Sequence, residues 1–108
     1  MPFYDISERE AKEIVPGGRI RTFWGDKSLL AIVELDSHTE VPAHAHSNEQ
    51  GGILLEGEME MGIGIDTRVL KPGDVYIIPG NVQHWARTEI SRAKALDIFS
   101  PAREDYKY

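Results

Sequence analysis

Three histidines and one glutamine provide the residue types of a metal site. His44 and His46 lie two positions apart, Gln50 follows closely, and His84 comes much later in the chain. Imidazole nitrogens suit several divalent metals, and an amide oxygen can complete the set. Because side chains two apart in a β-strand share a face, His44 and His46 can aim at one point. The spacing therefore predicts one bound divalent transition metal: Zn, Ni, Mn or Fe.

Two neighbouring residues compete for the oxygen position of this site. Gln50 shares the sequence parity of His44 and His46, which favours it. A turn at residues 47–48 would reset that parity and favour Glu49. A glutamine would leave the charge of the ion more available to an anionic substrate. A glutamate would resemble the histidine and carboxylate sets used in oxygen chemistry. We expect Gln50 and keep Glu49 as the alternative.

The elements that must position these residues are mostly short strands. A short helix is predicted at residues 7–15, because Ser7 could cap it and a Pro-Gly-Gly stretch ends it. Short runs of β-type residues separated by turn residues follow, at residues 20–24, 29–35, 52–55, 58–65, 67–70, 75–78, 84–88 and 93–99. This pattern predicts an all-β antiparallel sandwich or barrel. A closed barrel would also return His84 to the first two histidines.

Alternation within residues 58–65 is the clearest strand signal. Charged residues or glycines occupy the even positions, and the odd positions are apolar. We therefore expect four side chains to point into the core: Met59, Met61, Ile63 and Ile65. Met61 could also contact a bound substrate. His38 lies in a turn-like segment, and we expect it to be exposed and not a ligand.

The last strand and the tail after it contain a second group of candidate residues. Asp97 and Phe99 share one face of this strand by parity. If that face lines the interior, burial would raise the pKa of Asp97 and a nearby cation would lower it, which suits proton transfer. Arg103 could fold over the barrel mouth and hold a substrate carboxylate. The alternative places Asp97 in solvent and pairs Arg103 with an acidic neighbour.

In order and spacing, these residues resemble the two sequence motifs of the cupin superfamily. The first motif runs from His44 to Gly57, with glutamine in place of the usual glutamate. The second runs from Gly73 to His84, with Asn81 in place of a glycine. Gly57, Gly73 and Asn81 suit turns that need a positive φ. The resemblance implies a jelly-roll β-barrel with the metal inside.

The tail resembles that of one cupin group in particular. Small cupins of the KdgF-like group act on unsaturated uronates and have a similar Leu-Asp-x-Phe-x-Pro-x-Arg-Glu-Asp tail. The resemblance implies catalytic roles for Asp97 and Arg103 and a substrate contact for Phe99. It favours a metal-dependent isomerase that opens cyclic 4,5-unsaturated uronates to the linear keto form. An iron-dependent cupin dioxygenase and a non-catalytic cupin that binds a small acid are the alternatives.

Size and charge restrict the partners. The 108 residues suffice for one domain, with an N-terminal helix and strand at residues 1–27 that could contact a second copy, and a cupin barrel at residues 28–108. So small a domain gains from pairing, so we expect a homodimer. A net charge of −6 disfavours nucleic acid. The absence of long apolar runs and of a leader predicts no membrane association and a cytoplasmic protein.

Overall fold

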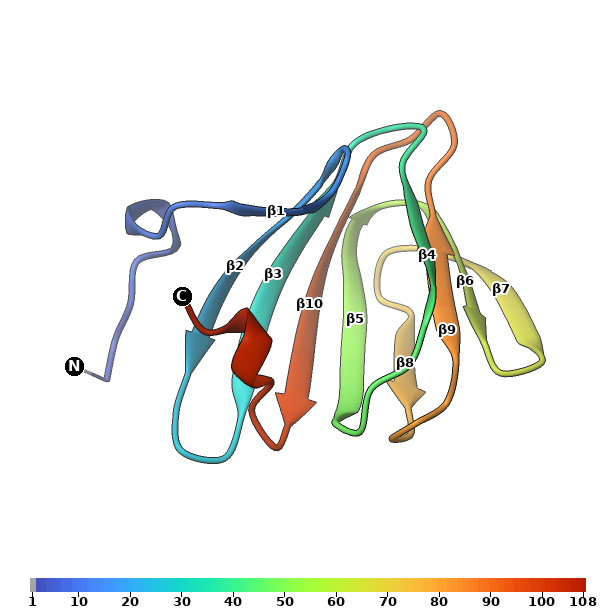
Figure 1. Cartoon of the computed structure of the whole chain (residues 1–108). Helices are drawn as coiled ribbons and strands as arrows, with labels where there is room; N and C mark the ends of the chain where they lie inside the picture. The colour runs from blue at the N-terminus through green and yellow to red at the C-terminus, as the bar shows by residue number, and fades with distance from the viewer. Residues whose placement is uncertain (1) are drawn as a thin grey trace.

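The computed structural model describes residues 2–108 as two β-sheets that face each other (Figure 1). The larger sheet has the spatial order β1 (Lys12–Val15), β2 (Gly18–Trp24), β3 (Leu29–Leu35), β10 (Ala93–Ser100), β5 (Glu49–Gly57) and β8 (Val75–Ile78). The smaller sheet has the order β4 (Glu40–His44), β9 (His84–Arg87), β6 (Met59–Ile63) and β7 (Asp66–Leu70). The paired strands are antiparallel, which confirms the predicted all-β architecture.

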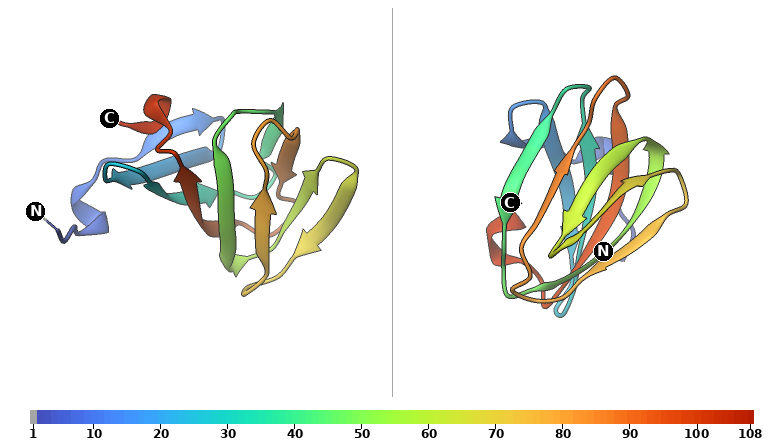
Figure 2. Two further views of the ribbon diagram at one scale, coloured as in Figure 1. Left: turned by 90° about the horizontal axis from the view of Figure 1, so that it is seen from below. Right: turned by 90° about the vertical axis from the view of Figure 1, so that its right-hand side faces the viewer.

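The chain passes back and forth between the two sheets. From β3 it crosses to β4, returns to β5, and crosses again to β6 and β7. Strands β8, β9 and β10 then alternate in the same way, which gives a jelly roll. Figure 2 shows the two sheets curving around one interior. This path places β9 beside β4, and β10 between β3 and β5, although these strands are far apart in the sequence.

The helix predicted at residues 7–15 is wrong. The segment forms one 3-10 turn, η1 (Ile6–Glu8), in which the backbone N–H of Ser7 donates a 2.9 Å hydrogen bond to the Asp5 side chain. The chain then continues as β1, which pairs with β2. A helix this short would be marginal in water, whereas β1 gains backbone hydrogen bonds to a neighbouring strand.

Strands β1 and β2 extend the larger sheet beyond β3, within the N-terminal unit predicted at residues 1–27. Met1 of that unit lies outside the described residues. A second 3-10 turn, η2 (Glu104–Tyr106), lies near the C-terminus, and the Thr22 hydroxyl of β2 donates a 2.6 Å hydrogen bond to the carbonyl oxygen of Tyr106. Within residues 2–108, no helix has the length and apolar character needed to cross a membrane.

The inward pattern predicted for residues 58–65 holds over its first part. Met59 and Met61 are buried and Ile63 is half-buried, as expected. Ile65 is fully exposed, which contradicts the prediction. The reason is that β6 ends at Ile63, and the next two residues form the turn into β7. Alternation predicts side-chain direction only while the backbone stays extended.

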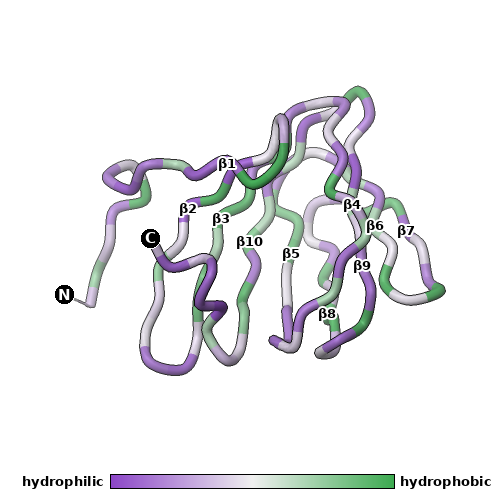
Figure 3. Tube along the Cα trace, viewed as in Figure 1, coloured by the Kyte–Doolittle hydropathy of each residue, from purple (hydrophilic) through white to green (hydrophobic). Residues whose placement is uncertain are grey.

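The core lies between the sheets and draws on both of them. Its most buried members include Leu54 of β5 and Ile78 of β8, and Met59 and Ala86 contribute from the smaller sheet. Figure 3 shows apolar residues recurring along the strands, while the turn between β2 and β3 is hydrophilic. Alternation along β10 turns its odd-numbered residues inward, so that Asp97 is buried and Ile98 is exposed.

Two turn glycines allow a direct test of backbone constraint. The positive φ predicted at three turn positions is confirmed, with +82° at Gly57, +94° at Gly73 and +66° at Asn81. A methyl group at Gly57 would also overlap the carbonyl oxygen of Arg92, whereas the space around Gly73 is open. We expect Gly57→Ala to lower the free energy of unfolding by about 3 kcal/mol or more, from strain and overlap together.

The matched variant Gly73→Ala should cost about 1–2 kcal/mol, because it adds backbone strain alone. Urea unfolding of both variants measures the difference. Equal losses of stability would show that the packing of Gly57 against Arg92 contributes nothing.

Candidate metal centre and active site

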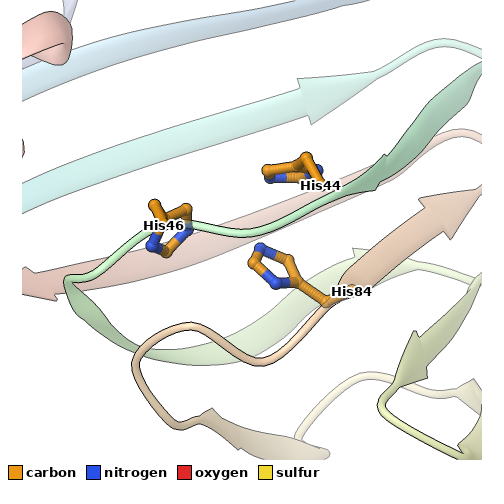
Figure 4. A group of neighbouring side chains, drawn as sticks. All are labelled: His44, His46 and His84. Atoms are coloured by element: carbon orange, nitrogen blue, oxygen red, sulfur yellow. The ribbon is translucent and has the colours of Figure 1, made fainter.

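Strand pairing brings together the three histidines predicted to bind metal. His44 is the last residue of β4, His84 is the first residue of β9, and the two are Cα partners in the β4–β9 pair. His46 follows two residues after His44, in the loop that leads to β5. One ring nitrogen from each lies within 4.8 Å of the others. Figure 4 shows the three rings gathered around a common space.

The rings are held by the backbone in one orientation. Each Nδ1 lies at hydrogen-bond distance from a carbonyl oxygen two residues away, at 2.9 Å for His44 and Pro42, 3.0 Å for His46 and Asn48, and 2.9 Å for His84 and Val82. A carbonyl oxygen can only accept, so in a neutral ring Nδ1 carries the proton and Nε2 carries a lone pair. Such bonds typically orient histidines that bind metals.

The environment of His84 fits a bound cation. Among the buried side-chain nitrogen and oxygen atoms of residues 2–108, Nε2 of His84 is the one without a hydrogen-bond partner. A buried polar atom left unpaired is costly, and a metal ion would supply the missing partner. Burial lowers the pKa of His84 to about 4 and also lowers the pKa of His46. Both rings are therefore neutral near pH 7, which is the form that binds metals.

The structure separates the two candidates for the oxygen position. Gln50 is 6% exposed, and its Oε1 lies 3.1 Å from Nε2 of His46, whereas Glu49 is exposed. Both facing atoms carry lone pairs when Nδ1 of His46 holds the proton, and a cation between them would relieve their repulsion. Ligand atoms that share one ion at bond lengths of about 2.1 Å are typically about 3 Å apart. These four residues therefore fit a divalent transition metal, with Zn, Fe, Ni and Mn all suitable.

Asp97 lies beside this group and is buried, so the alternative that placed it in solvent is wrong. It is 7% exposed and accepts hydrogen bonds from the Tyr76 hydroxyl at 2.5 Å and from Nε2 of Gln50 at 3.1 Å. Burial raises its pKa to about 6, although both hydrogen bonds act in the opposite direction. Burial and the adjacent carboxylate raise the pKa of Tyr76, so Tyr76 remains a hydrogen-bond donor.

The tail folds over the same end of the barrel. The guanidinium carbon of Arg103 lies 3.9 Å from the ring centre of Tyr106 and 5.6 Å from that of Phe99. Nε of Arg103 also donates to Asp105 at 2.9 Å, so Arg103 faces the pocket and pairs with an acidic neighbour at once. The Phe99 ring packs edge-on against His46 at 5.6 Å between centres.

One cavity connects most of the predicted site residues. Its lining includes His44, Gln50, Met61, His84, Asp97, Phe99 and Arg103. His46 borders this group through its contacts with Gln50 and Phe99. The fourth histidine, His38, is exposed in a turn and does not join the cluster.

Sequence reasoning missed two residues that organise the site. Tyr76 lies in an apolar run that the pattern favours as simple core, yet its hydroxyl donates to Asp97. The residue type indicates that this hydroxyl needs a partner, because a buried tyrosine usually has one, but it does not indicate which residue that partner is. Asn48 enters the sequence argument only through the possible turn at residues 47–48, and its side chain donates a 2.8 Å hydrogen bond to the carbonyl oxygen of Pro101. That contact joins the histidine loop to the tail, and local sequence gave no sign of it.

An antiparallel jelly roll with three histidines at an internal pocket is the architecture of a cupin. The protein family described as Cupin domain matches residues 31–99, and the chain belongs to this family.

Individual relatives extend this finding. The chain is 35% identical over 92 residues to the Bacillus subtilis protein named H2HPP isomerase, covering 76% of this chain but spanning 38% of that protein. It is 27% identical over 84 residues to the pectin degradation protein KdgF of Dickeya dadantii, covering 77% of this chain and 76% of the relative.

Solved structures agree on the fold. An RmlC-like cupin from Shewanella frigidimarina matches with a TM-score of 0.91 and 27% identity, covering 99% of this chain and 96% of that one. KdgF from Halomonas sp. matches with a TM-score of 0.90 and 24% identity, covering 99% of each chain.

Proposed function

We propose that this chain is a metal-dependent cupin enzyme that converts cyclic 4,5-unsaturated uronates into linear keto acids. The observation that carries the proposal is the convergence of three histidines and the Gln50 amide oxygen on a pocket that also contains Asp97 and Arg103. The similarity to a pectin degradation protein, at 27% identity, supports a sugar acid as the substrate. A cytoplasmic location and a homodimer stay predictions from the sequence.

Arg103 would orient the substrate. Its Nε is engaged by Asp105 and its plane stacks on Tyr106, so its terminal amino groups are the ones offered to a substrate carboxylate. His44, His46, Gln50 and His84 would hold the ion, which when bound supplies Lewis-acid polarisation of a substrate oxygen. Phe99 and Met61 would form the apolar walls of the pocket.

Asp97 would move the proton. The substrate loses the proton of its anomeric hydroxyl as the bond between the anomeric carbon and the ring oxygen breaks, which leaves an aldehyde and an enolate. The same number of protons returns when C4 is protonated, which gives the keto acid, so the reaction is an isomerisation with no added reactant. A buried carboxylate that lines the pocket is suited to both transfers.

The proposal is tested by the loss of ultraviolet absorbance of an unsaturated uronate. The substrate double bond is conjugated with its carboxylate, and the keto product lacks that conjugation. Protein supplied with Zn, Ni, Mn or Fe should accelerate the loss well above the rate in buffer, and stripping the metal with a chelator should abolish the acceleration. A rate equal to that in buffer with every metal would overturn the proposal. Oxygen uptake by the iron form would favour a dioxygenase instead.

A conservative change at Arg103 tests its role in binding. Arg103→Lys keeps the charge but loses the two-pronged geometry and the stacking on Tyr106. One charged hydrogen bond contributes about 1.5–3 kcal/mol, so we expect KM to rise about tenfold or more, with a smaller change in kcat. Arg92→Lys is the matched control, because Arg92 is exposed and pairs with Glu56 at 3.2 Å. An unchanged KM for Arg103→Lys would exclude Arg103 from carboxylate binding.

A further inference from the structure

Three adjacent strands of the larger sheet align Tyr76, Gly52 and Asp97 in one row. Gly52 of β5 is the Cα partner of Tyr76 on β8 and of Asp97 on β10. Neighbouring strands lie about 4.8 Å apart, so the outer two backbones are about 9.6 Å apart. A Cβ on the central residue would overlap both the tyrosine ring and an Asp97 oxygen. The glycine therefore leaves the space through which the tyrosine reaches the carboxylate.

A buried hydrogen-bond chain runs from Tyr76 through Asp97 to Gln50, at the candidate metal centre. The Tyr76 hydroxyl donates to Oδ1 of Asp97 at 2.5 Å. The other carboxylate oxygen, Oδ2, accepts from Nε2 of Gln50 at 3.1 Å. Tyr76, Asp97 and Gln50 are each 7% exposed or less, so little water competes for these bonds. A buried network that satisfies all its members fixes their orientations.

The direction of the Gln50 amide follows from this chain. An amide has a donor at one end and an acceptor at the other, whereas a carboxylate only accepts. Because Asp97 accepts at both oxygens, Gln50 must turn its NH₂ group toward Asp97 and its Oε1 toward Nε2 of His46, 3.1 Å away. A reversed amide would place its oxygen against an Asp97 oxygen and turn its NH₂ group toward the ion. Because the carboxylate only accepts hydrogen bonds, it decides which end of the Gln50 amide faces the metal.

We propose that Tyr76 is a positioning residue for the metal: through Asp97 it fixes the Gln50 amide with its oxygen toward the ion, and Gly52 makes the contact sterically possible. The inference rests on the metal site proposed above. It adds a tyrosine and a glycine, neither of which is among the proposed metal ligands, to the residues that determine metal affinity.

The test is Tyr76→Phe, which removes only the hydroxyl. Without that donor the carboxylate can rotate, and the amide loses its fixed direction. Loss of a partner behind a metal ligand typically weakens metal binding about 10–100-fold. We expect an effect near the lower end for Zn²⁺ in competition with a chromophoric chelator, together with a changed visible spectrum of bound Co²⁺. Tyr108→Phe is the matched control, because its hydroxyl donates to the carbonyl oxygens of Glu10 and Ile20, away from the site.

A double-mutant cycle separates positioning from general destabilisation. In a Gln50→Ala background there is no amide left to orient, so adding Tyr76→Phe should weaken Zn²⁺ binding no further. The inference is overturned if the Tyr76→Phe protein binds Zn²⁺ as tightly as the Tyr108→Phe protein. It is also overturned if Tyr76→Phe weakens Zn²⁺ binding by the same factor in the unmodified protein and in Gln50→Ala. If the metal affinities are as expected but the protein does not convert the uronate, the proposed reaction is overturned and the positioning role of Tyr76 is still supported.

Discussion

His84→Ala is expected to abolish tight metal binding. The substitution deletes a buried imidazole whose Nε2 has no hydrogen-bond partner within residues 2–108. It also removes the ring that β9 places directly opposite His44. Loss of a partner behind a ligand costs about 10–100-fold in affinity, so loss of the ligand itself should exceed about 100-fold. Titration with Zn²⁺ against a chromophoric chelator measures the change.

His38→Ala provides the matched control for this variant. His38 is the one histidine of the four that lies outside the cluster, and it is exposed. The His38→Ala variant should bind Zn²⁺ as the unmodified protein does. Circular dichroism should show that both variants keep their strands. Tight Zn²⁺ binding by a folded His84→Ala protein would place the metal elsewhere.

Asp97→Asn should produce the largest loss of activity at full metal occupancy. The asparagine keeps the size of the side chain but cannot take up a proton. General acid–base catalysis typically contributes about 10²–10⁴-fold, and we expect kcat to fall within that range. The substitution also replaces one of the two oxygens that accept hydrogen bonds from Tyr76 and Gln50 by an NH₂ group, so metal content must be brought to saturation before rates are compared. Uronate ring opening measured by ultraviolet absorbance gives the rate.

A second acidic residue provides the comparison for Asp97. Asp66 begins β7, is exposed, and lies outside the cavity that contains the histidines. Asp66→Asn should therefore leave kcat within experimental error of the unmodified enzyme. If the Asp97→Asn enzyme retained most of its kcat when saturated with metal, proton transfer would have to be assigned to another group.

The fold could be predicted largely because local signals and the global pattern agree. Turn residues divide the chain into short strands, and the positive φ at Gly57, Gly73 and Asn81 follows from residue type. The failures have a common cause. Residues 7–15 have a candidate helix cap and a Pro-Gly-Gly stop, but pairing of β1 with β2 decides their structure. Ile65 continues an alternating pattern, but the turn into β7 has already begun.

The histidine cluster could also be predicted, because parity places His44 and His46 on one side and a closed sheet returns His84 to them. The same parity favours Gln50 over Glu49, and the structure buries Gln50 and Asp97 while Glu49 is exposed. The contact between Tyr76 and Asp97 could not be predicted, because it depends on the register of three strands across Gly52. Spacing along the chain shows which residues share a face, and strand register shows which of them touch.

The most direct test of the metal site is elemental analysis of the protein purified without added metal, beside the double variant His44→Ala, His84→Ala. We expect about one equivalent of a divalent transition metal per chain in the unmodified protein and almost none in the folded double variant. A metal-free unmodified protein that stays empty after incubation with Zn, Ni, Mn and Fe, or an equal metal content in the two proteins, would contradict the account.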